Sequence, residues 1–218
     1  MKARLYIALL SCIIAISSCK EDEYVYPSVF TEFVDIKTDA SGKLAYINID
    51  DGSTFQIKDR SGIEGFTPDS TYRSLSIYEI LDESNGANLV RLYSCQFVIS
   101  VVPTTEDKFT KGIKTDPLDI DRIWRSGNYI NMVLDIMAKD KSHTLNFVDN
   151  GMTENSDGSK TLNITIYHDQ RNDYEAFTKK AYASIPLWPY KDIMKEGDKV
   201  TININTYKEG NTTREFYY

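Results

Sequence analysis

The residues most able to do covalent chemistry in this 218-residue chain are its three cysteines. Cys12 and Cys19 lie close together near the start, and Cys95 is the third. Cys19 ends the tetrapeptide Ile-Ser-Ser-Cys, in which a branched aliphatic residue and two small residues precede the thiol. This pattern is typical of a lipobox, where small residues admit a peptidase to the backbone and the thiol then carries a lipid. The sequence therefore predicts lipidation of Cys19.

The residues before that cysteine predict a secretory signal peptide over 1–18. Lys2 and Arg4 give it a positive start, and the apolar stretch 5–16 is shorter than the roughly 20 residues that a membrane-spanning helix needs. Each lipid methylene buried in a membrane contributes about 0.8 kcal/mol, so several acyl chains anchor a protein firmly. An ordinary signal peptide with a chance cysteine is the alternative.

The segment 19–27 is predicted to be a tether between the lipid and the folded protein. It continues after Cys19 with Lys-Glu-Asp-Glu. A lysine followed by acidic residues resembles the export signal of bacterial surface lipoproteins. We therefore expect a membrane contact through the N-terminal lipid, at the outer membrane and facing outward. A solvated tether on the periplasmic leaflet is the alternative.

The charge of the mature chain excludes one class of partner. Removal of 1–18 leaves 23 basic and 32 acidic side chains, which is a formal charge of −9. Nucleic-acid binding needs clustered Lys and Arg side chains at phosphates, so we expect no nucleic-acid partner.

The sequence does not predict an enzyme, a cofactor or a metal site. No Gly-x-Ser-x-Gly motif is present. His143 and His168 are expected to be solvent-facing or cross-strand polar residues, because a zinc site needs three or four suitably spaced ligands. The acidic turn around Asp157 lacks EF-hand spacing and is interpreted as a hairpin tip. Cys95 lies in an alternating apolar row and is expected to be a small core residue.

Alternation of apolar and polar residues dominates after residue 28 and predicts an all-β protein. Five candidate strands in 28–102 fit a small OB-like β-barrel, and six or seven in 122–218 fit an immunoglobulin-like β-sandwich. The segment 103–121 has two prolines and few large apolar residues, so it is predicted to be a linker. The clearest alternating rows are Ile130-Met132-Leu134-Ile136, Leu162-Ile164-Ile166 and Val200-Ile202-Ile204.

Two aromatic residues in a proline-framed loop are the candidate binding residues. Trp188 and Tyr190 lie in Pro-Leu-Trp-Pro-Tyr, and rigid exposed rings can stack on sugars or anchor a partner. The alternative is that Trp188 covers the sandwich end or the domain interface. Trp124, at the start of a predicted strand, is expected in the core. Ser70, in Asp-Ser-Thr, is a possible O-glycosylation site.

Several stretches together resemble the NigD-like lipoproteins. They include the lipobox, YINIDDGSTFQI at 46–57, RIWRSGNYINM at 122–132, HTLNFV at 143–148, and the ending TREFYY. The resemblance implies an N-terminal OB-type barrel followed by an immunoglobulin-like sandwich, in agreement with the strand count. The family name comes from a bacteriocin-associated gene cluster, which suggests immunity or secretion. The resemblance implies no catalytic residues.

Two functions remain open from the sequence. The first is a lipid-anchored surface protein that binds an extracellular glycan, peptide or protein. The second is an immunity or accessory lipoprotein associated with a secreted peptide or bacteriocin system. Fold alone does not decide between them.

Overall fold

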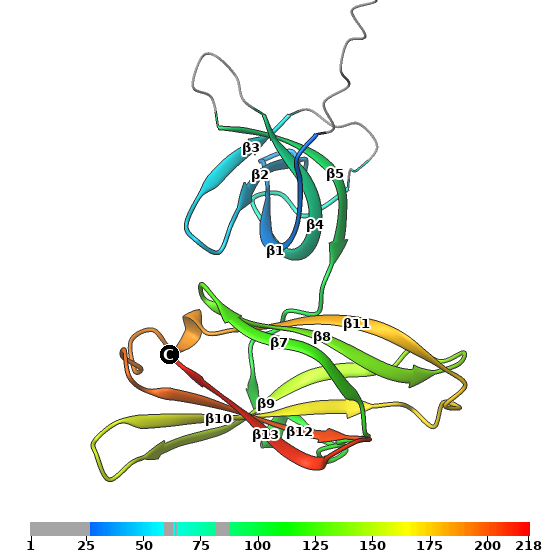
Figure 1. The fold of residues 1–218 in the computed structure, drawn as a ribbon, viewed down its shortest axis with the longest axis vertical. Coiled ribbons are helices and arrows are strands. Elements are labelled where there is room, and N and C mark those ends of the chain that lie inside the picture. Colours follow the sequence, from blue (N-terminus) through cyan, green and yellow to red (C-terminus); the bar gives the residue numbers. More distant parts are fainter. Residues whose placement is uncertain (1–26, 59–62, 64, 82–87) are drawn as a thin grey trace, which may run out of the picture.

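A computed structural model describes residues 27–58, 63, 65–81 and 88–218. Cys19, the signal peptide and nearly all of the tether lie outside the described residues. The described chain is all-β and forms a barrel followed by a sandwich (Figure 1). In this part of the chain, no helix is long and apolar enough to cross a membrane.

The N-terminal domain is a closed barrel with the strand order β1-β2-β3-β5-β4. The long strand β1 pairs with both β2 and β4, and a parallel pairing of β3 with β5 completes the closure. Five strands closed in this way form the predicted OB-like barrel. Its strands are β1 (Val29–Thr38), β2 (Leu44–Asn48), β3 (Thr54–Ile57), β4 (Thr71–Leu81) and β5 (Leu89–Phe97). Its core contains Val34, Ile36, Ile47, Ile57, Tyr78, Val90 and Leu92.

The apolar row predicted to begin with Tyr93, Cys95 and Phe97 does not form one buried face, because Tyr93 and Phe97 are exposed. The pairing of β4 with β5 skips Tyr93, which is a β-bulge. Leu92 before the bulge is buried, whereas Phe97 after it is exposed. Cys95 is half-buried and packs against the barrel core, as a small core residue would.

The C-terminal domain is a β-sandwich of two sheets. One sheet has the order β13-β12-β10-β9-β6, and the other has the order β11-β8-β7. The three apolar rows predicted from the sequence lie between the sheets, which confirms the sandwich. The strands are β6 (Thr104–Thr105), β7 (Asp119–Ser126), β8 (Tyr129–Ala138), β9 (Thr144–Glu154), β10 (Lys160–Asp169), β11 (Phe177–Pro186), β12 (Lys199–Thr206) and β13 (Gly210–Tyr217), with 3-10 turns η1 (Glu106–Lys108) and η2 (Trp188–Tyr190).

The segment 103–121 is built into the sandwich and is not the predicted linker. Strand β6 pairs with β9, and Leu118 is fully buried in the sandwich core. The His168 amide also donates to the Lys114 carbonyl at 2.9 Å. A few large apolar residues suffice here because backbone hydrogen bonds hold the rest of the segment.

Candidate functional site

Two polar turns, one from each domain, meet at the domain junction. Asp50 lies between β2 and β3, and Gly127 lies in the β7–β8 hairpin. The backbone φ of Gly127 is +52°, and a Cβ there would lie 2.7 Å from the backbone oxygen of Asp50. Only glycine allows this approach without displacing a neighbour. The turns belong to the family-typical stretches 46–57 and 122–132, so these stretches form the junction.

We expect Gly127→Ala to lower the free energy of unfolding by about 2 kcal/mol, from an unfavourable φ and a crowded contact with Asp50. Gly158→Ala is the matched control. Gly158 also has a positive φ (+80°) in a hairpin turn, but a Cβ there meets nothing within 4 Å. Thermal unfolding followed by circular dichroism measures both variants. Equal losses would show that the approach to Asp50 is not a constraint.

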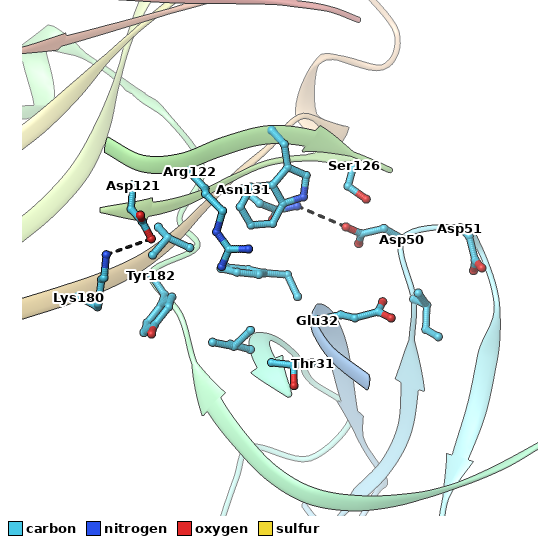
Figure 2. A pocket seen from close by; sticks show the side chains of 15 residues that line it. Thr31, Glu32, Asp50, Asp51, Asp121, Arg122, Ser126, Asn131, Lys180 and Tyr182 are labelled. Carbon is cyan, nitrogen blue, oxygen red and sulfur yellow. Dashed lines mark hydrogen bonds and ion pairs between the residues drawn. The ribbon is translucent and has the colours of Figure 1, made fainter. Parts of the chain in front are cut away.

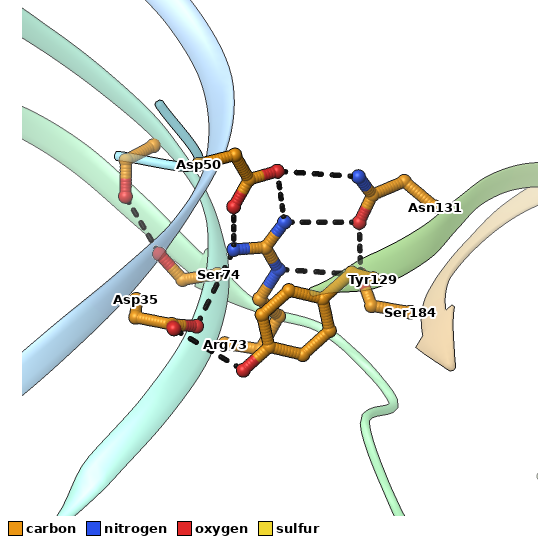
Figure 3. A network of polar contacts seen from close by, with 8 residues as sticks. Asp35, Asp50, Arg73, Ser74, Tyr129, Asn131 and Ser184 are labelled. Carbon is orange, nitrogen blue, oxygen red and sulfur yellow. Dashed lines mark hydrogen bonds and ion pairs between the residues drawn. The ribbon is translucent and has the colours of Figure 1, made fainter. Parts of the chain in front are cut away.

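Arg73 on β4 holds the acidic side of the junction together (Figure 3). Its Nη1 and Nη2 donate to the two carboxylate oxygens of Asp50 at 2.6 and 2.7 Å. Nη1 also donates to Asp35 at 3.3 Å. The Arg73 side chain is almost fully buried. Burial raises the pKa of Asp35, although Arg73 opposes this shift by favouring the charged carboxylate.

The same guanidinium reaches across to the sandwich. Its Nη2 donates to Asn131 at 3.0 Å, and its Nε donates to the Ser184 hydroxyl at 3.4 Å. It stacks 3.9 Å from the ring centre of Tyr129, whose hydroxyl donates back to Asp35 at 3.1 Å. Planar, bidentate and stacked contacts of this kind fix geometry as well as adding energy. We infer that this network sets the orientation of the two domains.

A cleft of about 680 Å³ opens between the barrel and the sandwich beside this network (Figure 2). Its volume falls within the usual range for small-ligand pockets. Both domains line it. The barrel contributes Thr31, Glu32, Phe33, Ile49, Asp50, Asp51 and Leu75, and the sandwich contributes Asp121, Arg122, Trp124, Ser126, Asn131, Val133, Lys180 and Tyr182.

One wall of the cleft is aromatic. The Trp124 ring packs edge-on against Phe33 with 5.3 Å between centroids, and Phe33 lies 6.3 Å from Tyr182. Trp124 is half-buried and belongs to neither domain core, so the prediction that it belongs to the core is wrong. It lies on β7, the edge strand of its sheet, where it faces the barrel across the cleft.

Charged side chains from both domains face the same space. Figure 2 shows Arg122 extending from β7 into the cleft, with Glu32 on the barrel side. Lys180 pairs with Asp121 at 3.0 Å. Burial raises the pKa of Glu32; the hydroxyl of Tyr78 partly offsets this shift, and the charges of nearby Asp50 and Asp51 add to it.

The structure separates the two predicted binding residues. Tyr190 is buried, and its hydroxyl donates to Asp149 at 2.9 Å, so it is not part of a binding surface. Trp188 is 51% exposed. It borders a smaller hollow of about 370 Å³ that Arg73 and Tyr129 also line, so it lies at the domain interface.

The predicted glycosylation residue Ser70 is half-buried just before β4. Its hydroxyl donates to the Pro68 carbonyl at 3.0 Å, and its amide donates to the Thr38 hydroxyl at 2.9 Å. A glycosyl group on Ser70 would have to replace the first of these bonds. Modification of Ser70 stays a prediction.

The two histidines form a buried cross-strand pair, so a solvent-facing position is wrong for both. His143 Nδ1 lies 2.9 Å from His168 Nε2, and the other His143 nitrogen lies 3.4 Å from an Asp173 oxygen. Burial lowers the pKa of His168 and favours its neutral form. Within the described ranges, no group of three or more His, Cys, Asp or Glu side chains is placed to hold a metal ion.

The junction between the two domains was not predicted from the sequence. Arg73 is the residue that could have indicated the junction. It is a buried charged residue on a strand that otherwise packs into a barrel. A buried arginine needs acidic or polar partners. The polar turns around Asp50 and Gly127 supplied candidates for the contact.

The comparisons with known proteins agree with this architecture. The model of the NigD-like C-terminal β-sandwich domain matches residues 100–218, which is more than half of the chain. The chain belongs to the NigD-like family. The NigD-like match begins before residue 103, so the segment predicted as a linker lies inside the matched domain.

Solved structures extend the similarity to both domains. A NigD-like immunity protein from Bacteroides caccae is 30% identical, with a TM-score of 0.71 over 89% of this chain and 99% of that one. A candidate toxin-related protein from Parabacteroides distasonis is 15% identical, with a TM-score of 0.66 over 88% of this chain and 93% of that one. A candidate lipoprotein from Bacteroides fragilis is 12% identical, with a TM-score of 0.58 over 88% and 97%. The last two share the NigD-like fold. No curated protein matches this chain.

Proposed function

We propose that this NigD-like protein is a lipid-anchored interaction protein of the bacterial envelope, without enzymatic activity, that binds an extracellular glycan, peptide or protein in the cleft at its domain junction. The observation that carries the proposal is the cleft of about 680 Å³, in which each domain supplies both charged and aromatic side chains. A ligand there would contact both domains at once.

The Arg73 network supports a binding role because it joins the two walls of the cleft before any ligand arrives. Its bonds to Asp50 and Asn131 link the barrel to the sandwich. A preformed cleft loses little conformational entropy on binding. Trp124 and Arg122, which face this space, offer stacking and charge-assisted contacts.

Native mass spectrometry tests this function directly. The full-length lipidated protein is purified from its own cells in a mild detergent, and its mass is compared with the mass of the lipidated chain alone. We expect a bound ligand in the wild type, reduced at least tenfold in Trp124→Ala and retained in Trp188→Ala. Equal ligand occupancy in both variants would reject the cleft as the site.

The proposed anchor is a lipid on Cys19, which places the protein at the outer membrane and facing outward. The Ile-Ser-Ser-Cys lipobox and the following Lys-Glu-Asp-Glu support this location. Anchoring at the periplasmic leaflet is the alternative. Protease treatment of intact cells separates the two, since an outward protein is cut before lysis and a periplasmic one is cut only after it.

We expect Cys19→Ala to abolish labelling by a palmitate analogue, because no other thiol lies in a lipobox. Cys12→Ala is the matched control and should label normally, since Cys12 leaves with the signal peptide. Labelling is read from the immunoprecipitated protein by in-gel fluorescence. Comparable labelling of Cys19→Ala and the wild type would remove the anchor from the proposal.

A second candidate function is protection against a secreted peptide or bacteriocin. The 30% identical structure from Bacteroides caccae, which carries the name NigD-like immunity protein, favours it. Deletion of the gene should then sensitise cells to culture supernatants of peptide-producing relatives. The wild-type gene should restore resistance. Unchanged sensitivity across such supernatants would leave ligand binding without a protective role.

A further inference from the structure

We propose that the cleft at the domain junction takes a basic peptide segment, in which lysine or arginine side chains face its carboxylates and an apolar neighbour packs on its aromatic wall. This inference rests on the proposed function and names the ligand class of the same cleft.

On the barrel side, one cation serves two carboxylates. Arg73 contacts Asp50 at 2.6 Å and Asp35 at 3.3 Å. A single positive charge therefore leaves one negative charge in excess behind the cleft. The excess charge produces a stronger negative potential here than it would in water, because the low-dielectric walls of the protein focus the electric field into the cleft.

On the sandwich side, the arrangement is repeated. Lys180 pairs with Asp121 at 3.0 Å and with Asp135 at 2.8 Å. This group again holds two carboxylates and one cation. Asp121 and Lys180 line the cleft, whereas Asp135 lies behind them and borders a separate hollow.

The remaining charged residues of the lining add to the excess. Glu32 and Asp51 come from the barrel, and Arg122 comes from the sandwich. Four carboxylates and two cations therefore line the cleft, an excess of two negative charges. Behind the lining, Arg73, Asp35 and Asp135 add one more negative charge in excess. A neutral sugar would gain nothing from this excess, and an acidic ligand would be repelled by it.

The aromatic wall favours apolar groups beside the basic side chains of the peptide. Trp124 and Tyr182 flank Phe33 and present apolar surface beside the carboxylates. Arg122 lies 5.7 Å over the Trp124 ring, so this wall already carries one cation–π contact. The stems of lysine and arginine side chains, and an adjacent leucine, can pack on the same wall. Alternating basic and apolar residues meet both requirements.

Tryptophan fluorescence can report on the cleft alone, because the chain has two tryptophans and only Trp124 lines the cleft. The full-length lipidated Trp188→Phe protein in neutral detergent is titrated with three probes, each to about 1 mM. These are acetyl-Gly-Lys-Leu-Lys-Leu-Gly amide, its counterpart with Glu in place of Lys, and maltotetraose. We expect only the basic peptide to change Trp124 emission, with at least tenfold weaker binding at 500 mM than at 50 mM salt, because salt screens the charges.

Paired charge variants tie the binding to the cleft. Glu32→Gln with Asp51→Asn should weaken the basic peptide at least tenfold. Glu154→Gln with Asp157→Asn removes the same charge at the exposed β9–β10 hairpin and should leave binding within twofold. The Trp124→Phe protein, with Trp188 as its reporter, should give no signal.

Other results would overturn the inference. They are equal binding of the acidic peptide or maltotetraose, equal weakening by both variant pairs, a signal from Trp188 alone, or no response to the basic peptide. The proposed function has a separate readout in native mass spectrometry. A Trp124-dependent ligand that is not a basic peptide would reject this inference and keep the binding site.

Discussion

Arg73→Met is expected to lower the free energy of unfolding by about 3–5 kcal/mol, because it leaves two partly buried carboxylates without their buried cation. Asp50 loses a bidentate contact at 2.6 and 2.7 Å, and Asp35 loses one at 3.3 Å. Methionine keeps much of the side-chain volume, so a cavity does not account for the loss. Differential scanning calorimetry at pH 7 measures it.

The pH dependence of the stability lost in Arg73→Met identifies the cause of that loss. Burial already raises the pKa of Asp35 above its value in the unfolded chain, and removal of the guanidinium raises it further because no cation then favours the charged carboxylate. A carboxyl group with a raised pKa destabilises the folded state once the pH exceeds its pKa in the unfolded chain. The destabilisation grows until the pH passes its pKa in the folded state. The deficit should therefore shrink between pH 7 and pH 5. A deficit that stays constant over this range would contradict the explanation by unpaired charge.

Arg91→Met is the matched control for Arg73→Met. Arg91 pairs with Glu79 on the barrel surface, and its side chain is 49% exposed. Exposed ion pairs contribute little to stability, so this variant should unfold at nearly the same temperature as the wild type. Arg73→Lys should fall between the two, because lysine keeps the charge but not the planar bidentate contact. Similar losses of stability for Arg73→Met and Arg91→Met would show that the Arg73 network does not stabilise the fold.

Tyr190→Ala is expected to lower the free energy of unfolding by about 3–5 kcal/mol, as truncation of a buried aromatic side chain does. The ring packs in the sandwich core, and its hydroxyl donates to Asp149 at 2.9 Å. Truncation therefore creates a cavity and leaves a carboxylate oxygen without its donor. Chemical denaturation followed by circular dichroism measures the change.

Trp188→Ala, in the same loop, is the control for Tyr190→Ala. Trp188 is 51% exposed, so its loss should be under about 1 kcal/mol. Tyr190→Phe separates the hydroxyl from the ring and should cost about 1 kcal/mol. If Trp188→Ala destabilises the protein as much as Tyr190→Ala, both rings are structural. If Tyr190→Ala is neutral, the buried position of Tyr190 is wrong.

The strands were predictable because alternation reports directly which side chains face a core. Ile130, Met132 and Leu134 alternate with polar or smaller neighbours, and all three are fully buried between the sheets. The segment 103–121 was not predictable in this way. Backbone pairing of Thr104–Thr105 with β9 leaves no apolar pattern in the sequence.

The split between Trp188 and Tyr190 follows from local geometry. In an extended loop, residues two apart point to the same side. The structure instead has a 3-10 turn at Trp188–Tyr190, where each residue rotates by about 120°. The two rings therefore point in different directions, one toward solvent and one into the core.

The cleft was beyond sequence reasoning because its parts come from distant segments. Glu32, Asp50 and Trp124 belong to three strands or turns in two domains. Alternation tells which face of a strand is polar, but not which other surface that face meets. Only the contact between the two polar turns brings these side chains to one place.

Photo-crosslinking in intact cells tests the claim that the cleft is the binding site. A photoreactive benzoylphenylalanine in place of Thr31 samples the cleft while leaving Trp124 intact, and the same residue at position 154 samples the exposed end of β9. After irradiation, we expect a crosslinked species at position 31 that mass spectrometry assigns to one ligand, and none at position 154. Crosslinking at position 154 alone, or the same products at both positions, would contradict the claim.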